Sequence, residues 1–172
     1  MKSILKKLSV LFSVILLAAS FVGCSAGEKT FSKAGVSITL TEKFVEKEYI
    51  TQTCYYESPD MLVMVLKEEF DVFPGVGDWS VEQYTTTTIQ VNGLKVEYEM
   101  SDEGYAYFEY EKTLSGNDYK YLATCHKSDD AFWLIQFASF TKNYDDLKAD
   151  MFNYANSITF VTQSASESVE KV

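Results

Sequence analysis

Alternating apolar and polar residues predict strands in the first half of the chain. In segment 36–41 (VSITLT) every second side chain is apolar, which is typical of a strand with one buried face. Segment 47–57 is rich in Tyr, Thr and Ile and is also expected to be a strand. Segment 61–66 (MLVMVL) is continuously apolar and predicts a strand covered on both faces. The Ser-Pro-Asp sequence at 58–60 predicts a turn between them.

The spacing of apolar residues becomes helical near position 80. Ser80 and Gln83 have the spacing of a capping box, in which the serine hydroxyl accepts a hydrogen bond from the backbone and the glutamine side chain reaches back to the cap. Four consecutive threonines at 85–88 lower the helix propensity, because β-branching restricts χ1. The expected inner face of this helix comprises Val81, Tyr84, Thr88 and Ile89. Asn-Gly at 92–93 ends the helix or begins the next turn.

Strand-like segments separated by turn residues fill positions 94 to 140. They are 94–100, 105–113, 119–127 and 131–140, and they predict an antiparallel meander. A helix over 143–157 and a short strand at the edge of the sheet, 159–161, are expected to follow. Because two strands are apolar on both faces, helices should cover both sides of the sheet. The predicted fold class is α+β, a central antiparallel β-sheet flanked by helices.

The first 23 residues have the pattern of a signal peptide. Three lysines precede an apolar run of about fifteen residues, shorter than the ~20 that a membrane-spanning helix needs. The run ends in Phe-Val-Gly-Cys at 21–24, which resembles the lipobox of bacterial lipoproteins, although Phe21 replaces the usual leucine. The resemblance implies that Cys24 is lipidated and becomes the N-terminus after cleavage. The alternatives are an ordinary secretory signal with a chance cysteine, or an uncleaved anchor.

This pattern divides the chain into four parts. Residues 1–23 are expected to be the signal peptide, 24–30 a lipidated tether, 31–161 a single α+β domain and 162–172 a flexible acidic tail. The 172 residues are 47% hydrophobic, which suits one folded domain. The net charge of −10 argues against nucleic acid as a partner, because its recognition needs a basic surface.

Three apolar stretches resemble one known family. They are 31–38 (FSKAGVSI), 132–138 (FWLIQFA), and Phe152 with Ile-Thr-Phe at 158–160. They are similar to the fold shared by the PsbP extrinsic subunit of photosystem II and the Ran-binding Mog proteins, which also occurs in small bacterial lipoproteins. The resemblance covers residues 31–160 and implies an α/β/α sandwich. It also implies a binding or assembly-accessory role rather than catalysis.

A search of the sequence for catalytic, cofactor and metal motifs finds none. His126 is the single histidine and follows Cys125, but neighbouring side chains of a strand point to opposite faces and do not pair as base and nucleophile. Acidic pairs such as 102–103 and 129–130 lack the EF-hand pattern and fit a solvated surface. Cys54 and Cys125 leave two alternatives, a disulfide formed outside the cytoplasm or two buried free thiols. No cofactor and no metal are expected.

Two aromatic regions are candidates for binding. The loop 70–79 carries Phe70, Phe73 and Trp79, which either display a partner-binding surface or fold back onto the core. In the strand 105–113 one face holds two tyrosines and two glutamates, which form either a binding surface or a face packed under a helix.

We therefore expect a non-catalytic, lipid-anchored binding or accessory protein on the extracytoplasmic face of the cell membrane. Its partner would be another envelope protein or a small ligand. The alternatives are an envelope hydrolase that uses a carboxylate pair and a calcium-binding module.

Overall fold

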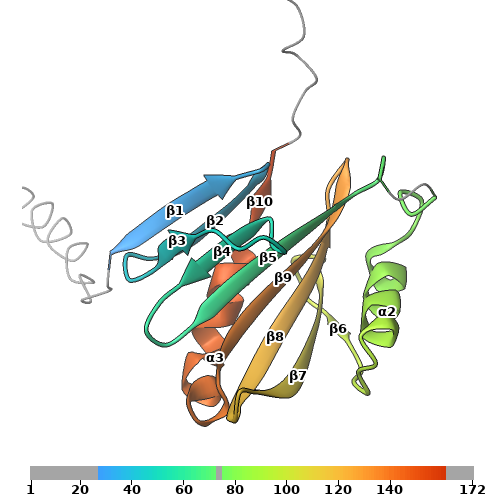
Figure 1. Ribbon diagram of the computed structural model, residues 1–172. Helices are drawn as coiled ribbons and strands as arrows, with labels where there is room; N and C mark the ends of the chain where they lie inside the picture. Colours follow the sequence, from blue (N-terminus) through green and yellow to red (C-terminus); the bar gives the residue numbers. More distant parts are fainter. Residues whose placement is uncertain (1–26, 73–74, 162–172) are drawn as a thin grey trace, which may run out of the picture.

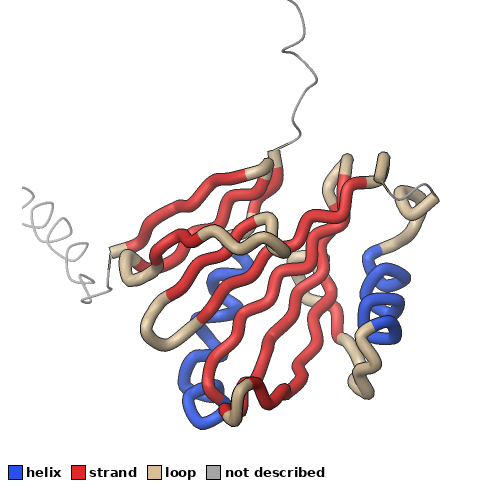
Figure 2. Tube along the Cα trace, in the orientation of Figure 1, coloured by secondary structure: helices blue, strands red, loops and turns tan. Residues whose placement is uncertain are grey.

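The computed structural model describes residues 27–72 and 75–161, which form ten strands and two helices (Figures 1 and 2). In chain order these elements are β1 (Glu28–Lys33), β2 (Val36–Thr41), β3 (Val45–Lys47), β4 (Cys54–Glu57), β5 (Leu62–Glu69), α2 (Val81–Val91), β6 (Glu99–Met100), β7 (Ala106–Leu114), β8 (Asn117–Lys127), β9 (Ala131–Phe140), α3 (Thr141–Asn156) and β10 (Thr159–Phe160). Within these ranges no helix has the length and apolar character needed to span a membrane. The expected leader, Cys24, Phe73 and the tail 162–172 lie outside the described residues.

Seven antiparallel strands form the central sheet in the order β3-β4-β5-β9-β8-β7-β6. The predicted meander is confirmed, because β6 to β9 are consecutive neighbours. The pairing of β9 with β5 then brings together residues far apart in the sequence, from Leu62 opposite Ala138 to Glu69 opposite Ala131. A second sheet has the order β1-β2-β10. The prediction that segment 159–161 lies at the edge of the central sheet is therefore wrong, because the short strand β10 pairs with β2 in the second sheet.

The central sheet separates two hydrophobic cores, and each helix packs on one of them (Figure 2). Strands β1 and β2 also pack on the α3 side. This α3-side core includes Tyr56, Val63, Trp133, Ile135, Phe137, Tyr144 and Met151, all at most 1% exposed. The α2-side core consists of Tyr84, Ile89, Ala106, Phe108, Ala123, Cys125, Phe132 and Leu134. Helices on both sides of an antiparallel sheet confirm the predicted α+β fold class.

Helix α2 begins with the predicted capping box. Ser80 Oγ accepts from the backbone N–H of Gln83 at 3.3 Å, and Gln83 Oε1 accepts from the N–H of Ser80 at 2.9 Å. The predicted inner face is confirmed: Tyr84, Thr88 and Ile89 are buried, and Val81 is partly buried and packs against the α2-side core. Thr85 is also fully buried, which the sequence did not predict. Thr85 satisfies its hydroxyl by donating to the carbonyl of Val81 at 2.7 Å, which lets a polar side chain face the core.

Three predicted segments differ in the structure. Segment 47–57 is not one strand, because residues 48–53 form a loop between β3 and β4 in which Ile50 is fully exposed. Segment 94–98 keeps the predicted alternation of half-buried and exposed residues, but only Glu99–Met100 pairs with β7. Strand β1 begins at Glu28 and so takes in residues that the sequence assigned to the tether.

Candidate functional site

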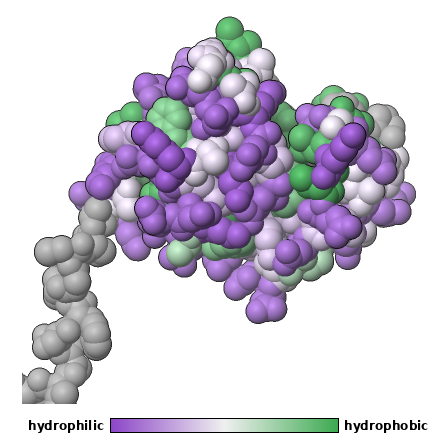
Figure 3. Space-filling model, turned by 90° about the horizontal axis from the view of Figure 1, so that it is seen from below, coloured by the Kyte–Doolittle hydropathy of each residue, from purple (hydrophilic) through white to green (hydrophobic). Residues whose placement is uncertain are grey.

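An apolar hollow lies between α2, the segment that leads into it and one end of the central sheet. It is lined by Glu68, Val76, Trp79, Tyr84, Thr87, Thr88, Val91 and Phe132, and its volume is about 360 Å³. We call this hollow the α2 groove. Hydrophobic residues gather on the side of the surface where α2 lies (Figure 3). Small-molecule sites are typically mostly apolar hollows of about 300–1,000 Å³ with a few polar groups, and the α2 groove fits that description.

Stacked aromatic side chains form the floor of the α2 groove. The ring of Tyr84 lies parallel to that of Phe132 with the centroids 4.3 Å apart. Phe70 meets Phe132 edge-on at 5.2 Å. Phe132 itself is fully buried in β9, so the stack ties α2 to the most buried part of the sheet. This arrangement fixes the direction in which the Tyr84 hydroxyl points.

Lys127 holds the segment that carries Trp79. Its Nζ donates to the carbonyl oxygens of Gly77 and Trp79, each at 2.7 Å, and lies 5.4 Å from the ring centroid of Phe132. Phe70 and Trp79 both pack against the α2-side core. The described part of the loop therefore folds back onto the core, the second of the two alternatives. Trp79 is at the same time a wall of the α2 groove.

Glu68 is the carboxylate that lines the α2 groove. It accepts a hydrogen bond from the hydroxyl of Tyr84. Burial and this hydrogen bond raise the pKa of Tyr84, so the hydroxyl stays protonated and continues to donate at neutral pH. Among the described residues no lysine forms an ion pair with Glu68. Within residues 27–72 and 75–161 the Tyr84 hydroxyl is the one hydrogen-bond donor to this carboxylate, which leaves it acceptor capacity for a ligand.

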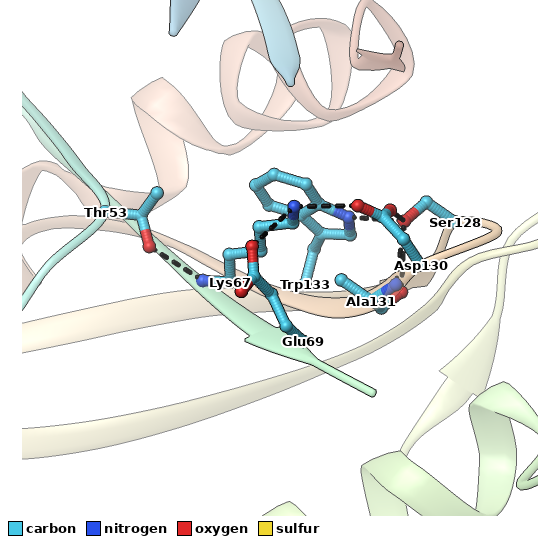
Figure 4. A network of polar contacts seen from close by, with 7 residues as sticks. All are labelled: Thr53, Lys67, Glu69, Ser128, Asp130, Ala131 and Trp133. Atoms are coloured by element: carbon cyan, nitrogen blue, oxygen red, sulfur yellow. Dashed lines mark hydrogen bonds and ion pairs between the residues drawn. The ribbon is translucent and has the colours of Figure 1, made fainter. Parts of the chain in front are cut away.

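A polar network on the opposite face of β5 fixes the strand that carries Glu68 (Figure 4). Lys67 Nζ donates to Glu69 at 2.9 Å and to Asp130 at 2.8 Å. Burial acts to lower the pKa of Lys67, but the two carboxylates outweigh it and hold that pKa raised. Ser128 Oγ accepts from the indole N–H of Trp133 at 3.0 Å and donates to Asp130 at 2.7 Å. The network joins the ends of β5 and β9 and holds Glu68 opposite Phe132.

The two cysteines of the domain are free thiols on opposite sides of the sheet. Cys54 belongs to the α3-side core and Cys125 to the α2-side core. The disulfide alternative is therefore not realised, and the second alternative, two buried thiols, describes the structure. Burial raises the pKa of Cys125 to about 12, so this thiol is not a nucleophile at neutral pH.

The remaining candidate residues serve packing. His126 is 8% exposed, stacks on Tyr105 at 4.7 Å and shares a hydrogen bond with Thr124 Oγ1 at 3.0 Å. Tyr105 is buried, and its strand neighbour Tyr107 packs edge-on against Phe152 of α3 at 5.0 Å. The tyrosine face of β7 is accordingly packed under a helix, the second of its two alternatives.

Besides the α2 groove, three hollows of about 460, 210 and 500 Å³ have Glu48, Glu103 and Glu97, respectively, as their acidic lining residues. Each of the four hollows thus has one carboxylate, whereas glycoside hydrolysis needs two. No group of three or more His, Cys, Asp and Glu side chains in residues 27–72 and 75–161 is placed to hold a metal ion.

Sequence reasoning singled out Trp79 but missed Glu68, Tyr84 and Phe132 as members of one site. The sequence assigns Phe132 to an apolar strand and Tyr84 to a helix face, and it gives Glu68 no role. The signal that unites them is the pairing of β5 with β9, in which Glu68 lies opposite Phe132.

Comparison with known proteins places the fold. No protein-family model and no curated protein matches the chain. Among solved structures, this chain is similar to cyanobacterial PsbP (CyanoP) of Synechocystis sp. PCC 6803. The TM-score is 0.57 and the sequence identity 14%, and the similarity covers 86% of this chain and 99% of that chain. The Ran-binding protein Mog1p of Saccharomyces cerevisiae gives a TM-score of 0.52 at 10% identity, over 80% of this chain and 97% of that chain. This chain has the PsbP and Mog1 fold.

A third similar structure is a protein of Bacteroides thetaiotaomicron, with a TM-score of 0.54 and 11% identity. It covers 81% of this chain, which spans 50% of that longer protein. At such identities the similarity concerns the fold alone. The PsbP-like fold expected from the three apolar stretches is confirmed, while lipid anchoring stays a prediction.

Proposed function

We propose that this chain is a non-catalytic, lipid-anchored binding protein on the extracytoplasmic face of the cell membrane, with the α2 groove as its ligand site. The observation that carries the proposal is the groove itself, an apolar hollow of about 360 Å³ with Trp79, Tyr84 and Phe132 in its lining. Of these three, Trp79 is only partly buried and offers apolar ring surface to a ligand, while Tyr84 and Phe132 close the bottom of the groove. The accessory role of PsbP-like proteins supports a binding function by analogy of fold.

The location rests on the leader sequence. Three lysines, a short apolar run and Gly-Cys at 23–24 follow the order of a lipoprotein signal. Metabolic labelling with a palmitate analogue tests this part. Wild-type chain should carry the label and Cys24→Ala should not. Label retained by Cys24→Ala would refute lipidation at this residue.

The ligand site is tested separately with a small neutral probe, 2-phenylethanol. Saturation-transfer NMR on the full chain in dodecyl maltoside micelles should detect transfer to the phenyl ring. Val91 lines the rim and is 77% exposed, so Val91→Trp should fill the groove without disturbing the core and should remove most of the transfer. Ile50→Trp is the control, because Ile50 is fully exposed and lines a different hollow. Equal transfer to wild type and Val91→Trp would reject the α2 groove as the ligand site.

A further inference from the structure

We infer that the α2 groove selects an organic cation, a protonated amine attached to an apolar or aromatic body. This inference rests on the proposed function and specifies the ligand class of the same site. Its starting point is the combination of one carboxylate with aromatic walls in a mostly apolar hollow. Aromatic rings attract cations through their quadrupole, and the attraction grows when water is excluded.

The charge balance of the groove favours a cation over a neutral or anionic group. Glu68 is held by the Tyr84 hydroxyl and has no lysine partner among residues 27–72 and 75–161. The nearest lysine along the same row of the sheet is Lys127, whose Nζ is committed to the carbonyls of Gly77 and Trp79. A carboxylate beside apolar surface gains most from a partner that supplies both a positive charge and N–H donors.

The remaining lining residues define the rest of the ligand. Val76, Trp79 and Val91 are apolar walls, and Thr87 and Thr88 add the hydroxyls of α2. Tyr84 and Phe132 are stacked ring on ring and almost completely buried at the bottom of the groove, so Trp79 is its more accessible aromatic side chain. A ligand with a slender apolar body can lie against Trp79, Val76 and Val91 with its amine directed at Glu68. The net charge of the chain, −10, adds long-range attraction for cations.

Three probes of one size test the charge selectivity: phenethylammonium, 2-phenylethanol and phenylacetate. Their dissociation constants are measured with the full chain in dodecyl maltoside micelles from the fluorescence of Trp79. Trp133 gives a constant background, because it is 1% exposed on the other side of the sheet. We expect phenethylammonium to bind about tenfold more tightly than 2-phenylethanol, and phenylacetate to bind most weakly.

Glu68→Gln isolates the charge, because glutamine retains an oxygen acceptor for the Tyr84 hydroxyl. The preference for phenethylammonium should fall to less than twofold in this variant. Glu97→Gln is the matched control, since Glu97 lines the hollow on the other side of α2, and it should retain the tenfold preference. Glu68→Asp keeps the charge and should keep a preference for the cation. This result would show that the loss in Glu68→Gln comes from the missing charge and not from a general disturbance of the fold by substitution at this position.

The outcomes separate this inference from the proposed function. Equal affinities of the wild type for phenethylammonium and 2-phenylethanol, or a preference that survives Glu68→Gln, would overturn the inference and leave the groove as a neutral ligand site. Absence of binding by both probes would overturn the inference and the proposed ligand site together. A preference that is lost in Glu68→Gln and retained in Glu97→Gln would establish it.

Discussion

The two helices lie on opposite faces of one sheet, yet they pack on it in different ways. Helix α3 buries large side chains completely, with Tyr144 and Met151 at 0% exposure. Helix α2 instead lies between two hollows, the α2 groove of about 360 Å³ and a second hollow of about 500 Å³ that includes Ile89. We infer that the α3 side supplies most of the stability, whereas the α2 side leaves apolar surface open for a ligand.

The cause of this difference is visible in the two helix sequences. Helix α2 has 11 residues, and two of its four buried positions are threonines, Thr85 and Thr88. A threonine fills less space than a leucine or methionine, and β-branching lowers its helix propensity. Helix α3 has 16 residues, and partly buried residues such as Leu147, Phe152 and Tyr154 add to its fully buried positions. The shorter, threonine-rich helix cannot close its side of the sheet.

The first prediction tests this difference in packing by removing one large side chain from each helix. Met151→Ala should destabilise the protein by about 3–5 kcal/mol, because a tightly packed site cannot collapse around the cavity. Ile89→Ala should cost about 2 kcal/mol, because Ile89 already borders a hollow. Urea unfolding of both variants measures the difference. A larger loss for Ile89→Ala would mean that α2 is the better packed helix.

The second prediction concerns His126, which stacks on Tyr105 of the α3-side core and reports how well this side excludes water. Burial lowers the pKa of His126 to about 4, from an ordinary value near 6.5. The unfolded state therefore binds a proton between pH 6.5 and 4 that the folded state does not. Neutral His126 therefore contributes to the free energy of unfolding fully above pH 6.5. This contribution, on the order of 3 kcal/mol in total, is lost as the pH falls toward 4.

NMR titration measures this pKa directly, because the chain has a single histidine. Urea unfolding at several pH values should show the same slope, and His126→Gln should lack most of it. A titration midpoint near 6.5 would show that water reaches His126 and that the α3 side is less closed than its packing indicates.

Much of this architecture follows from local patterns. Segment 36–41 forms β2 because its apolar residues alternate, and 131–140 forms β9 with the predicted bounds because a turn signal precedes its apolar run and a helical pattern follows it. The capping box at Ser80 was equally predictable. By contrast, the loop at 48–53 contains no Gly or Pro, and its composition is typical of a strand. The sequence therefore gives no sign that this segment connects the two strands of a hairpin.

The candidate site was harder to predict, because it depends on register between distant strands. Trp79 stood out as a loop aromatic, but Glu68 joins it only because β5 pairs with β9 and places Glu68 opposite Phe132. A shift of one residue would turn Glu68 to the α3 side. Composition and periodicity do not specify which strands of an antiparallel sheet become neighbours when they are far apart in the chain.

The third prediction tests the link between α2 and the sheet. Tyr84→Phe keeps the ring that stacks on Phe132 but removes the hydroxyl that donates to Glu68. A hydrogen bond to a charged group that is partly open to water should be worth about 1–1.5 kcal/mol, so the free energy of unfolding should fall by that amount. Thermal or urea unfolding provides the measurement. No change would mean that water replaces the hydroxyl at Glu68 without loss, and that stacking alone holds α2 in place.

The smallest expected effect concerns the start of α2. Ser80→Ala removes the cap that accepts from Gln83 N–H, and Gln83→Ala removes the return bond to Ser80. Each should cost about 0.5–1 kcal/mol. Because the two bonds hold the same turn, the double variant should lose less than the sum of the single losses. Ser80→Asp is the control, since aspartate is a good cap and its charge suits a helix N-terminus. Additive losses would show that the two hydrogen bonds act independently. Packing of α2 on the sheet would then be enough to hold the first turn in place when one of the bonds is missing.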